Sequence, residues 1–314
     1  MKLIKPSFEI LEQLPGLEGV YKQIELAGRT CYKSEDKITE DSAKEFVDRM
    51  IKSGHGAMLE HGTVYLSIPC YIDYSDYGDI IYPDSYYTYE TNPYSKVEVE
   101  VKRWSNNGIL HVTTNLRVLV ENGWMEDLQY ICEPTEYHEK RHTVKFTCDR
   151  GVSHEFVRHR VFSFAQESTR YCNYSKDKFG NEITCILPPW LSENDLPKGF
   201  GYTSDDWGSL ICEFYYEATE KGKSEGFTIE PVRNFVFALQ TSEQLYFSLL
   251  KEGWKAQEAR SVLPNALKTE LVMTGFVSDW KHFFELRCPG SAHPQARELA
   301  IPLQEKFKEL KWVD

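Results

Sequence analysis

The sequence lacks any long hydrophobic run. No segment of the 314-residue chain approaches eighteen consecutive apolar residues, which argues against a membrane-spanning helix. The opening stretch, MKLIKPSFEILEQLPG, has neither an apolar signal core nor a small-residue cleavage site. We therefore expect a cytoplasmic protein with no membrane partner.

The sequence also lacks the spacings of common metal and redox sites. None of its eight cysteines forms a Cys-x-x-Cys pair, which excludes zinc-ribbon and thioredoxin-like interpretations and is typical of reduced thiols. His154, Glu155 and His159 superficially resemble a zinc protease, but their spacing is one residue too long for both imidazoles to share a helical face. We expect no metal site.

Positive charge is scarce as well. The formal net charge is −12 and the sequence pI is about 5.3, so no long-range positive field would attract nucleic acid or an anionic membrane. What is present is a globular composition with enough chain for a real core, 41% hydrophobic and 27% charged. The 14% aromatic content suits either a bulky core or a site that stacks flat ligands.

Hydrophobic periodicity outlines a mixed chain. Alternation predicts strands over 64–68, 96–102 and 142–149. Helical spacing predicts helices over 42–53, 116–131 with a break at Asn122-Gly123, 209–221, 242–252 and 266–286, and after His293-Pro294. The Tyr- and Asp-rich stretch 71–95 has no period and indicates a long loop or an inserted lobe.

These elements predict one α/β (α+β) domain over 1–314. We expect a central mixed or antiparallel sheet flanked by long helices. An insertion of about 71–141 would form a separate lobe on it.

Cations gather in one stretch, RHRVFSFAQESTRYCNYS at 158–175. Three arginines and a histidine within thirteen residues of an acidic chain predict a local anion site. If 153–160 is a helix capped by Ser153, Arg158 and Arg160 point about 200° apart and serve different partners. The alternative for Arg158 is an ion pair with Glu155, three residues earlier.

Beyond Phe162 the pattern stops being helical. In an extended segment Gln166, Ser168 and Arg170 share one face, where a carboxamide, a hydroxyl and a guanidinium can bind an anion such as a nucleotide. The alternative is a polar edge strand.

Three segments together resemble flavin-dependent thymidylate synthases. Arg158-His159-Arg160, followed after seven residues by Ser168, resembles the RHR-x7-S signature of that family. SGHGAMLEH (53–61) resembles its Gly-His-x-x-x-x-Glu-His element, and ARSVLP (259–264) with HFFELR (282–287) resembles its C-terminal nucleotide-binding half. The resemblance covers about 1–70 and 142–314 and leaves the insertion unexplained.

The resemblance implies a reductive methylation of dUMP to dTMP. Such an enzyme uses FAD as cofactor, methylenetetrahydrofolate as carbon donor and NADPH as reductant. It also implies a homotetramer whose active sites are built from several subunits.

The resemblance assigns roles by position. It ties Arg287, His55 and Ser168 most closely to activity. It places Arg158, His159, Arg160, Glu60, Gln166 and His282 beside the flavin. Its dUMP-binding positions are Glu155, Arg158, Gln166, Ser168, Thr169, Arg170, Arg260 and Arg287.

Local chemistry bears on two of these residues. Arg287 continues the apolar face of its helix, so it needs an anionic or hydrogen-bonding partner; the alternative is a favourable position at a helix C-terminus. Ser168 has only Glu167 nearby, which would point to the other face of an extended segment. A nucleotide-binding hydroxyl is therefore preferred to a nucleophile.

Some positions depart from the family pattern. Ala165 and Gln166 stand where Asn-Glu is usual, and Cys31 stands where serine is frequent. Phe276, Ser278 and His282 replace residues thought to contact the flavin. We expect that Phe276 could instead stack on the adenine.

Two other functions remain open from the sequence. A flavin-free, cysteine-dependent pyrimidine methyltransferase would need an activated thiolate, and Cys70 and Cys288 are the nearest candidates. A nucleotide-binding module without catalysis would bind dUMP and leave a flavin unoxidised.

Overall fold

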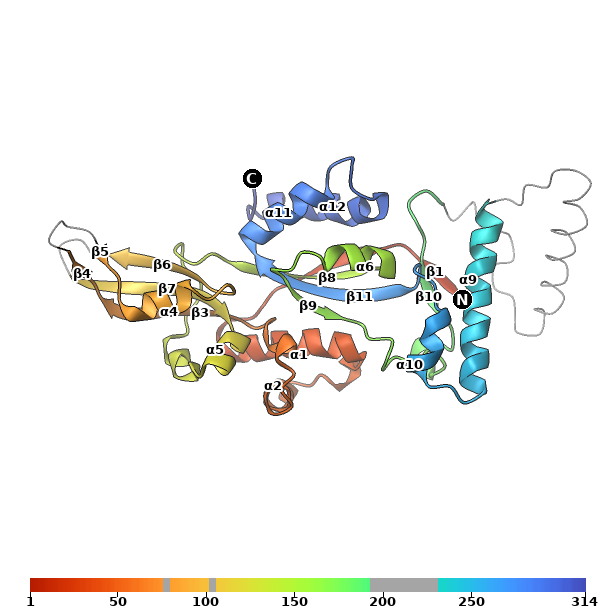
Figure 1. The fold of residues 1–314 in the computed structure, drawn as a ribbon, viewed down its shortest axis with the longest axis horizontal. Helices are drawn as coiled ribbons and strands as arrows, with labels where there is room; N and C mark the ends of the chain where they lie inside the picture. Colours follow the sequence, from red (N-terminus) through yellow and green to blue (C-terminus); the bar gives the residue numbers. More distant parts are fainter. Residues whose placement is uncertain (76–79, 102–105, 193–230) are drawn as a thin grey trace, which may run out of the picture. The chain divides into compact units, whose positions relative to one another are not determined.

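The computed structural model describes residues 1–75, 80–101, 106–192 and 231–314 (Figure 1). The helix expected over 209–221 lies outside these residues. The chain divides into two compact units, each assembled from several segments. Unit 1 comprises Met1–Pro6, Cys148–Ser153 and Ser168–Thr269, and unit 2 comprises Ser7–Thr147, His154–Glu167 and Glu270–Asp314. One catalytic domain carrying an insertion stays a prediction.

A four-stranded sheet lies at the centre of unit 2, in the order β2-β8-β11-β9. Its strands are β2 (Ser7–Leu11), β8 (Arg141–Asp149), β9 (Ser163–Gln166) and β11 (Lys268–Phe276). The pairs β2–β8 and β9–β11 are both antiparallel. The strand predicted over 142–149 and the expected α/β class with an antiparallel central sheet are therefore confirmed.

Helices pack on both faces of this sheet, α11 and α12 on one and α1 on the other (Figure 1). Val20 and Ile24 of α1 share a buried cluster with Ala165 and Val272 of the sheet. On the opposite face the rings of Trp280 and Phe283 pack against Phe146, and Phe307 packs against Trp280. The helices of unit 2 that frame the sheet are α1 (Gly16–Tyr32), α2 (Ser42–Lys52), α3 (Gly56–Leu59), α11 (Val277–Arg287) and α12 (Pro294–Glu309).

Unit 2 also contains a three-stranded antiparallel sheet, β3-β7-β6. These strands are β3 (Thr63–Tyr71), β6 (Lys96–Val101) and β7 (Asn107–Asn115). Asn115 accepts a hydrogen bond from the Val118 amide and so caps α5 (Leu116–Asn122), which ends at Gly123 in the left-handed conformation. The predicted break at Asn122-Gly123 is confirmed, and a 3₁₀ turn follows at Met125–Tyr130.

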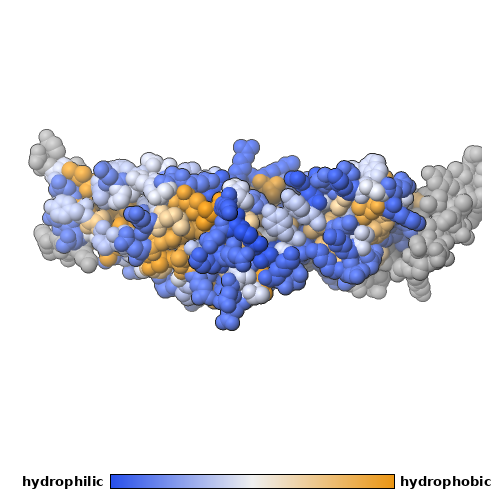
Figure 2. All heavy atoms as spheres, turned by 90° about the horizontal axis from the view of Figure 1, so that it is seen from below, coloured by the Kyte–Doolittle hydropathy of each residue, from blue (hydrophilic) through white to orange (hydrophobic). Residues whose placement is uncertain are grey.

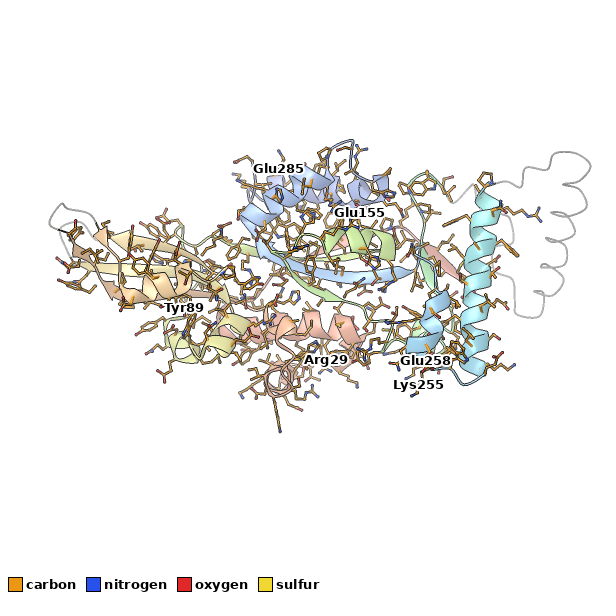
Figure 3. All side chains as sticks on the ribbon, in the orientation of Figure 1. Arg29, Tyr89, Glu155, Lys255, Glu258 and Glu285 are labelled. Atoms are coloured by element: carbon orange, nitrogen blue, oxygen red, sulfur yellow. The ribbon has the colours of Figure 1, made fainter. Side chains whose placement is uncertain are left out.

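The stretch 71–95, expected to be a long loop or an inserted lobe, contains secondary structure that its sequence did not indicate. It forms the short pair β4 (Asp73–Tyr74) and β5 (Ile80–Ile81) and a helix, α4 (Asp84–Glu90). Tyr89 of α4, labelled in Figure 3, is almost fully buried, and its hydroxyl donates to Asp127 at 2.5 Å. This anchor is a tertiary contact, which local periodicity does not report.

The helix expected over 266–286 is wrong in its first half. Residues Lys268–Phe276 form strand β11, which lies between β8 and β9 and is buried along most of its length. A strand buried on both faces is almost uniformly apolar, so its pattern resembles that of a buried helix. Only Val277–Arg287 is helical.

The helix expected to start at Ser153 starts earlier. Helix α6 runs over Arg150–Phe156, and the Asp149 carboxylate accepts from the Val152 amide at 2.8 Å, the bond that Ser153 was expected to supply. Ser153 instead donates to the Arg150 carbonyl. Residues 157–162 form turns, so the helical geometry expected for Arg158 and Arg160 is wrong.

Unit 1 has its own core. Strand β1 (Lys2–Ile4) pairs in parallel with β10 (Thr184–Ile186), and the helices are α9 (Pro231–Lys251) and α10 (Ala256–Ala259). Tyr174, Tyr246 and Leu267 belong to its buried cluster. Lys255 and Glu258, labelled in Figure 3, close the start of α10, where the Lys255 amide donates to the Glu258 carboxylate. Among the residues that the structure describes, further 3₁₀ turns lie at Glu35–Lys37, Asp177–Phe179 and Arg260–Val262.

The surface is mainly polar on the face drawn in Figure 2, with separate apolar patches. Of the helices that the structure describes, none combines the length and apolar character needed to cross a membrane.

Candidate functional site

The signature segment begins where helix α6 ends. Arg158 and His159 lie in a turn closed by backbone bonds to the carbonyls of Glu155 and Phe156. The side chains of Arg158 and Arg160 are exposed, and neither guanidinium has a hydrogen-bond or ion-pair partner among the described residues. Two exposed, unpaired guanidinium groups are well suited to bind an anion.

Arg287, the last residue of α11, is bound by the signature segment. Its Nη1 donates to Glu155 Oε2 at 2.8 Å, its Nη2 to the Glu155 carbonyl at 2.7 Å, and its Nε to His159 Nε2 at 3.0 Å. The Arg287 side chain is only 16% exposed. Figure 3 labels Glu155 on α6, below α11. The ion pair of Glu155 with Arg158 is therefore wrong, because Glu155 pairs with Arg287.

His159 is a neutral acceptor in this arrangement. Because Arg287 Nε–H donates to Nε2, the ring proton of His159 lies on Nδ1. Burial, together with the nearby Arg287 and His282, lowers the pKa of His159 to about 4. The positive charge of the signature segment at neutral pH therefore comes from its arginines.

His55 and Glu60 flank the short helix α3. His55 Nδ1 lies 3.0 Å from the Tyr32 hydroxyl. Glu60 accepts from Arg117 Nη1, and Arg117 Nε donates to Glu121 at 2.7 Å. Both residues are thus oriented by neighbours, and their place beside a flavin stays a prediction.

A buried arginine that the sequence analysis missed lies at the start of β8. Arg141 Nη1 donates to the Glu60 carbonyl at 3.0 Å, and its Nη2 donates to Ser163 Oγ at 3.1 Å. Burial lowers the pKa of Arg141 to about 10. In an alternating strand Arg141 shares a face with Thr143 and lies opposite Phe146, so the local pattern gave no clear signal of its burial.

The same interior holds His61 and Phe276. Burial and the neighbouring Arg141 lower the pKa of His61 to about 3, and its Nδ1 lies 2.8 Å from Thr274 Oγ1. This supports a structural role for His61. The Phe276 ring is 5% exposed, with the Arg141 guanidinium 5.4 Å and the Lys96 ammonium 5.6 Å from its centroid. Its stacking on adenine stays a prediction.

The extended face expected for Gln166, Ser168 and Arg170 is wrong. Strand β9 ends at Gln166, and the amides of Tyr171 and Cys172 both bond to the Ser168 carbonyl at 3.0 Å, which makes a turn. Serine side chains often form hydrogen bonds with nearby backbone groups in a turn, in place of the bonds of a strand. An alternating sequence pattern does not reveal such a turn.

Within unit 1, Arg260 lies beside this turn. Its Nη1 donates to Thr169 Oγ1 at 3.2 Å, and the Arg170 guanidinium lies over the Tyr171 ring at 5.5 Å. Arg170 and Arg260 are both exposed. The structure thus joins Thr169 with Arg260 in unit 1, and Glu155, His159 and Arg287 in unit 2.

His282 is exposed on α11, and its Nδ1 lies 3.3 Å from the carboxylate of Glu285, which Figure 3 labels. In the part of the chain that the structure describes, no group of three or more His, Cys, Asp and Glu side chains is arranged to hold a metal ion.

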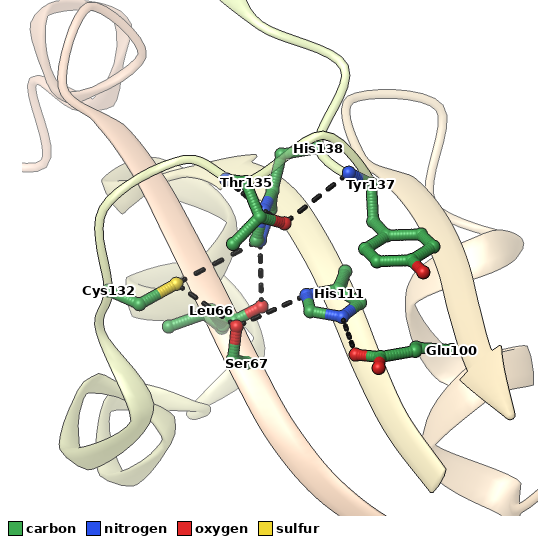
Figure 4. A network of polar contacts seen from close by, with 8 residues as sticks. All are labelled: Leu66, Ser67, Glu100, His111, Cys132, Thr135, Tyr137 and His138. Atoms are coloured by element: carbon green, nitrogen blue, oxygen red, sulfur yellow. Dashed lines mark hydrogen bonds and ion pairs between the residues drawn. The ribbon is translucent and has the colours of Figure 1, made fainter. Parts of the chain in front are cut away.

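A second polar cluster joins the β3-β7-β6 sheet to the segment 131–138 (Figure 4). His111 bridges Ser67 and Glu100, with 3.2 Å from Nδ1 to Ser67 Oγ and 3.2 Å from Nε2 to Glu100 Oε2. His138 Nδ1 accepts from the Thr135 amide, so its Nε2 carries the proton and donates to the Leu66 carbonyl at 3.0 Å. His138 is therefore no base for Cys132, and the cluster holds the 131–138 segment onto β3.

The chain belongs to the family described as thymidylate synthase complementing protein, Thy1. The family profile matches residues 137–311, more than half of the chain. The matched part contains the RHR signature, Arg260 and Arg287, and it leaves out His55 and Glu60. The family expected from the sequence is thereby confirmed.

Individual relatives agree with this. The chain is 29% identical over 160 residues to the flavin-dependent thymidylate synthase of Corynebacterium aurimucosum, covering 51% of this chain and 54% of that protein. It is 30% identical over 159 residues to that of Geobacter sulfurreducens (51% and 52%) and 31% identical over 162 residues to that of Corynebacterium diphtheriae (51% and 54%). The chain thus matches about half the length of these curated relatives.

Among solved structures, the UMP/dUMP methylase PolB from Streptomyces cacaoi, bound with 5-Br dUMP, aligns with a TM-score of 0.40 and 16% identity. The alignment covers 99% of this chain and 93% of that one.

Proposed function

We propose that this protein methylates dUMP to dTMP, with FAD as cofactor, methylenetetrahydrofolate as carbon donor and NADPH as reductant. The observation that carries the proposal is the RHR-x7-S signature, which lies inside the part of the chain that matches the family. Two of its guanidinium groups, Arg158 and Arg160, are exposed without a protein partner among the described residues. Relatives with the flavin-dependent name support the cofactor.

The residues present fit two anionic ligands. Arg158 and Arg160 would bind the pyrophosphate of FAD. The His159 ring between them in the sequence is neutral, so it can accept a hydrogen bond and does not repel a positively charged donor. In unit 1, Ser168, Thr169, Arg170 and Arg260 would bind the dUMP phosphate and sugar. When bound, the flavin supplies the hydride and one-carbon chemistry, and the protein supplies orientation and electrostatics.

Arg287 would orient the pyrimidine. Its guanidinium is already fixed by Glu155 and His159, so little side-chain entropy is lost when a ligand arrives. The Glu155 carboxylate is paired with this guanidinium, so its negative charge is compensated next to the anion site.

Neither of the two thiols considered for the flavin-free alternative is activated. Burial raises the pKa of both Cys70 and Cys288, the two candidates for a thiolate nucleophile. A thiol with a raised pKa is mostly protonated at neutral pH and is a poor nucleophile.

The absorbance spectrum of the purified protein tests the proposal. We expect oxidised flavin that bleaches with NADPH under anaerobic conditions and recovers when methylenetetrahydrofolate and dUMP are added together. The double variant Arg158→Gln, Arg160→Gln should lose flavin. The control double variant Lys306→Gln, Lys308→Gln, on α12, should keep it. Protein that neither holds nor binds FAD would overturn the proposal.

The same proposal includes a homotetramer in the cytoplasm, with no nucleic-acid partner. Analytical ultracentrifugation should give four times the 36.6 kDa chain mass. A monomer that is fully active would contradict active sites built from several subunits.

A further inference from the structure

Two arginines hold Glu60, and one of them comes from the segment 71–141 that the resemblance leaves unexplained. Arg141 Nη1 donates to the Glu60 carbonyl at 3.0 Å and holds the backbone. Arg117 Nη1 donates to Glu60 Oε1 and holds the side chain, which is 17% exposed. Glu60 Oε2 has no partner among the described residues and is not buried. One carboxylate oxygen is therefore held, and the other is available to accept from a ligand.

The backbone of unit 2 places Arg117 near Glu60. Strands β3 and β7 pair along their full length, and α5 follows β7 directly. The Leu116 amide, at the start of α5, donates to the Gly62 carbonyl at 3.0 Å. Arg117 is the next residue, and Glu60 lies two residues before Gly62, so the ion pair joins segments that the backbone already brings together.

The Arg117 guanidinium is itself oriented by a second carboxylate. Its Nε donates at 2.7 Å to Oε1 of Glu121, which lies four residues later on α5. The planar guanidinium directs two of its nitrogens to two different carboxylates, which a single ammonium cannot reproduce. Arg117 therefore presents Nη1 to Glu60 in a fixed direction.

Gly56 leaves room for this arrangement against α3. A Cβ placed on Gly56 would lie 3.0 Å from Arg117 Nε and 3.1 Å from Glu121 Oε1. The φ angle of Gly56 is not in the left-handed region, so the close approach of these side chains is the reason for a glycine here. The Arg117–Glu121 pair thus packs directly on the residue that follows His55.

We propose that Arg117 is a positioning residue for FAD, acting through Glu60. The proposal rests on the proposed function, in which Glu60 lies beside the flavin. Arg117 holds Glu60 Oε1, and Oε2 accepts a hydrogen bond from an N–H or O–H group of the cofactor. The segment 71–141 then contributes to the cofactor site through one residue of α5.

A double-mutant cycle of Glu60→Gln and Arg117→Gln tests the proposal, with the dissociation constant of FAD as the readout. Flavin fluorescence follows titrations of the flavin-free full chain, so no turnover is needed. We expect each single variant to weaken FAD binding about tenfold, as for the loss of a charge-assisted hydrogen bond. The double variant should bind about as weakly as Glu60→Gln alone, because Arg117 acts through Glu60.

Two further variants separate this role from a general effect of charge or folding. Arg117→Lys keeps a donor for Glu60 and should bind FAD within about threefold of the parent chain. Lys44→Gln removes an ion pair with Asp48 of the same spacing on exposed α2, and it should leave FAD binding unchanged. Circular dichroism should show every variant folded, since the Arg117 side chain is 38% exposed.

Two results would overturn this proposal alone. One is parent-like FAD binding by Arg117→Gln. The other is an equal loss from Arg117→Gln with and without Glu60→Gln, because Arg117 would then act by its own charge or only hold α5 in place. A parent chain that binds no FAD would overturn the proposed function, and this proposal with it.

Discussion

At the scale of single residues, Arg287 has the most specific environment of the expected site residues. Its three nitrogens each have a different acceptor, on Glu155 twice and on His159. A lysine has one charged nitrogen and cannot reproduce this planar, forked geometry.

We predict that Arg287→Lys lowers dUMP-dependent flavin oxidation by about 10–100-fold, equivalent to the loss of about 1.5–3 kcal/mol for a charge-assisted hydrogen bond. Stopped-flow absorbance measures this. Arg297→Lys on α12 is the matched control, since Arg297 bonds only to the Cys288 carbonyl among described residues. Equal rates for Arg287→Lys and the parent chain would refute the role.

Tyr89 offers a second test at this scale. We predict that Tyr89→Phe lowers the free energy of unfolding by about 1–2 kcal/mol, because it removes the hydrogen bond to Asp127 and leaves that carboxylate with one donor fewer. Urea denaturation measures it. Tyr87→Phe is the control, since Tyr87 is 50% exposed two residues earlier, and should change stability by less than about 0.5 kcal/mol.

At the scale of elements, helix ends carry local signals that survive in the structure. Gly123 ends α5 with φ +76°, as its place after Asn122 indicated, and Asn115 caps the start. The cap and the left-handed glycine both depend on residues close together in the chain, so features of this kind can be predicted from sequence.

We predict that Gly123→Ala destabilises the protein by about 1 kcal/mol, because an alanine is strained at positive φ although no atom lies within 4 Å of its Cβ. Gly290→Ala, where the space is equally open and φ is not positive, should change stability by less than half as much. Thermal denaturation compares the two, and equal shifts would contradict the strain argument.

Elements that are stabilised by residues distant in the sequence could not be predicted from local patterns. Strand β11 was expected to be a helix because its apolar run is compatible with both, and only its position between β8 and β9 makes it a strand. Helix α4 lies in the stretch expected to be a long loop or an inserted lobe. Its sequence did not indicate a helix, because its anchor Tyr89 depends on Asp127, far along the chain.

At the scale of the whole molecule, histidines whose pKa is lowered by burial make stability depend on pH. Burial lowers the pKa of His61 to about 3 and those of His142 and His159 to about 4, from an ordinary value of 6.5. Between pH 6.5 and 4 the unfolded chain therefore binds more protons than the folded one.

We predict that the free energy of unfolding falls as the pH is lowered from 6.5 to 4, by up to about 1.4 kcal/mol per pH unit for each proton taken up on unfolding. Urea denaturation across this range measures the slope. His142→Gln should reduce the slope, and His154→Gln, at an exposed position, should leave it unchanged. A slope identical in both variants would show that His142 takes up no proton on unfolding.

The sequence by itself determined the family, the α/β class, the helix break at Asn122-Gly123, and which residue types carry charge into an acidic chain, because these depend on residue order and short-range periodicity. Only the tertiary structure decided that Glu155 and His159 bind Arg287, that Arg141 is buried at the start of β8, and that Ser168 lies in a turn. Those outcomes depend on contacts between residues far apart in the chain, whose burial and hydrogen bonding no local pattern records.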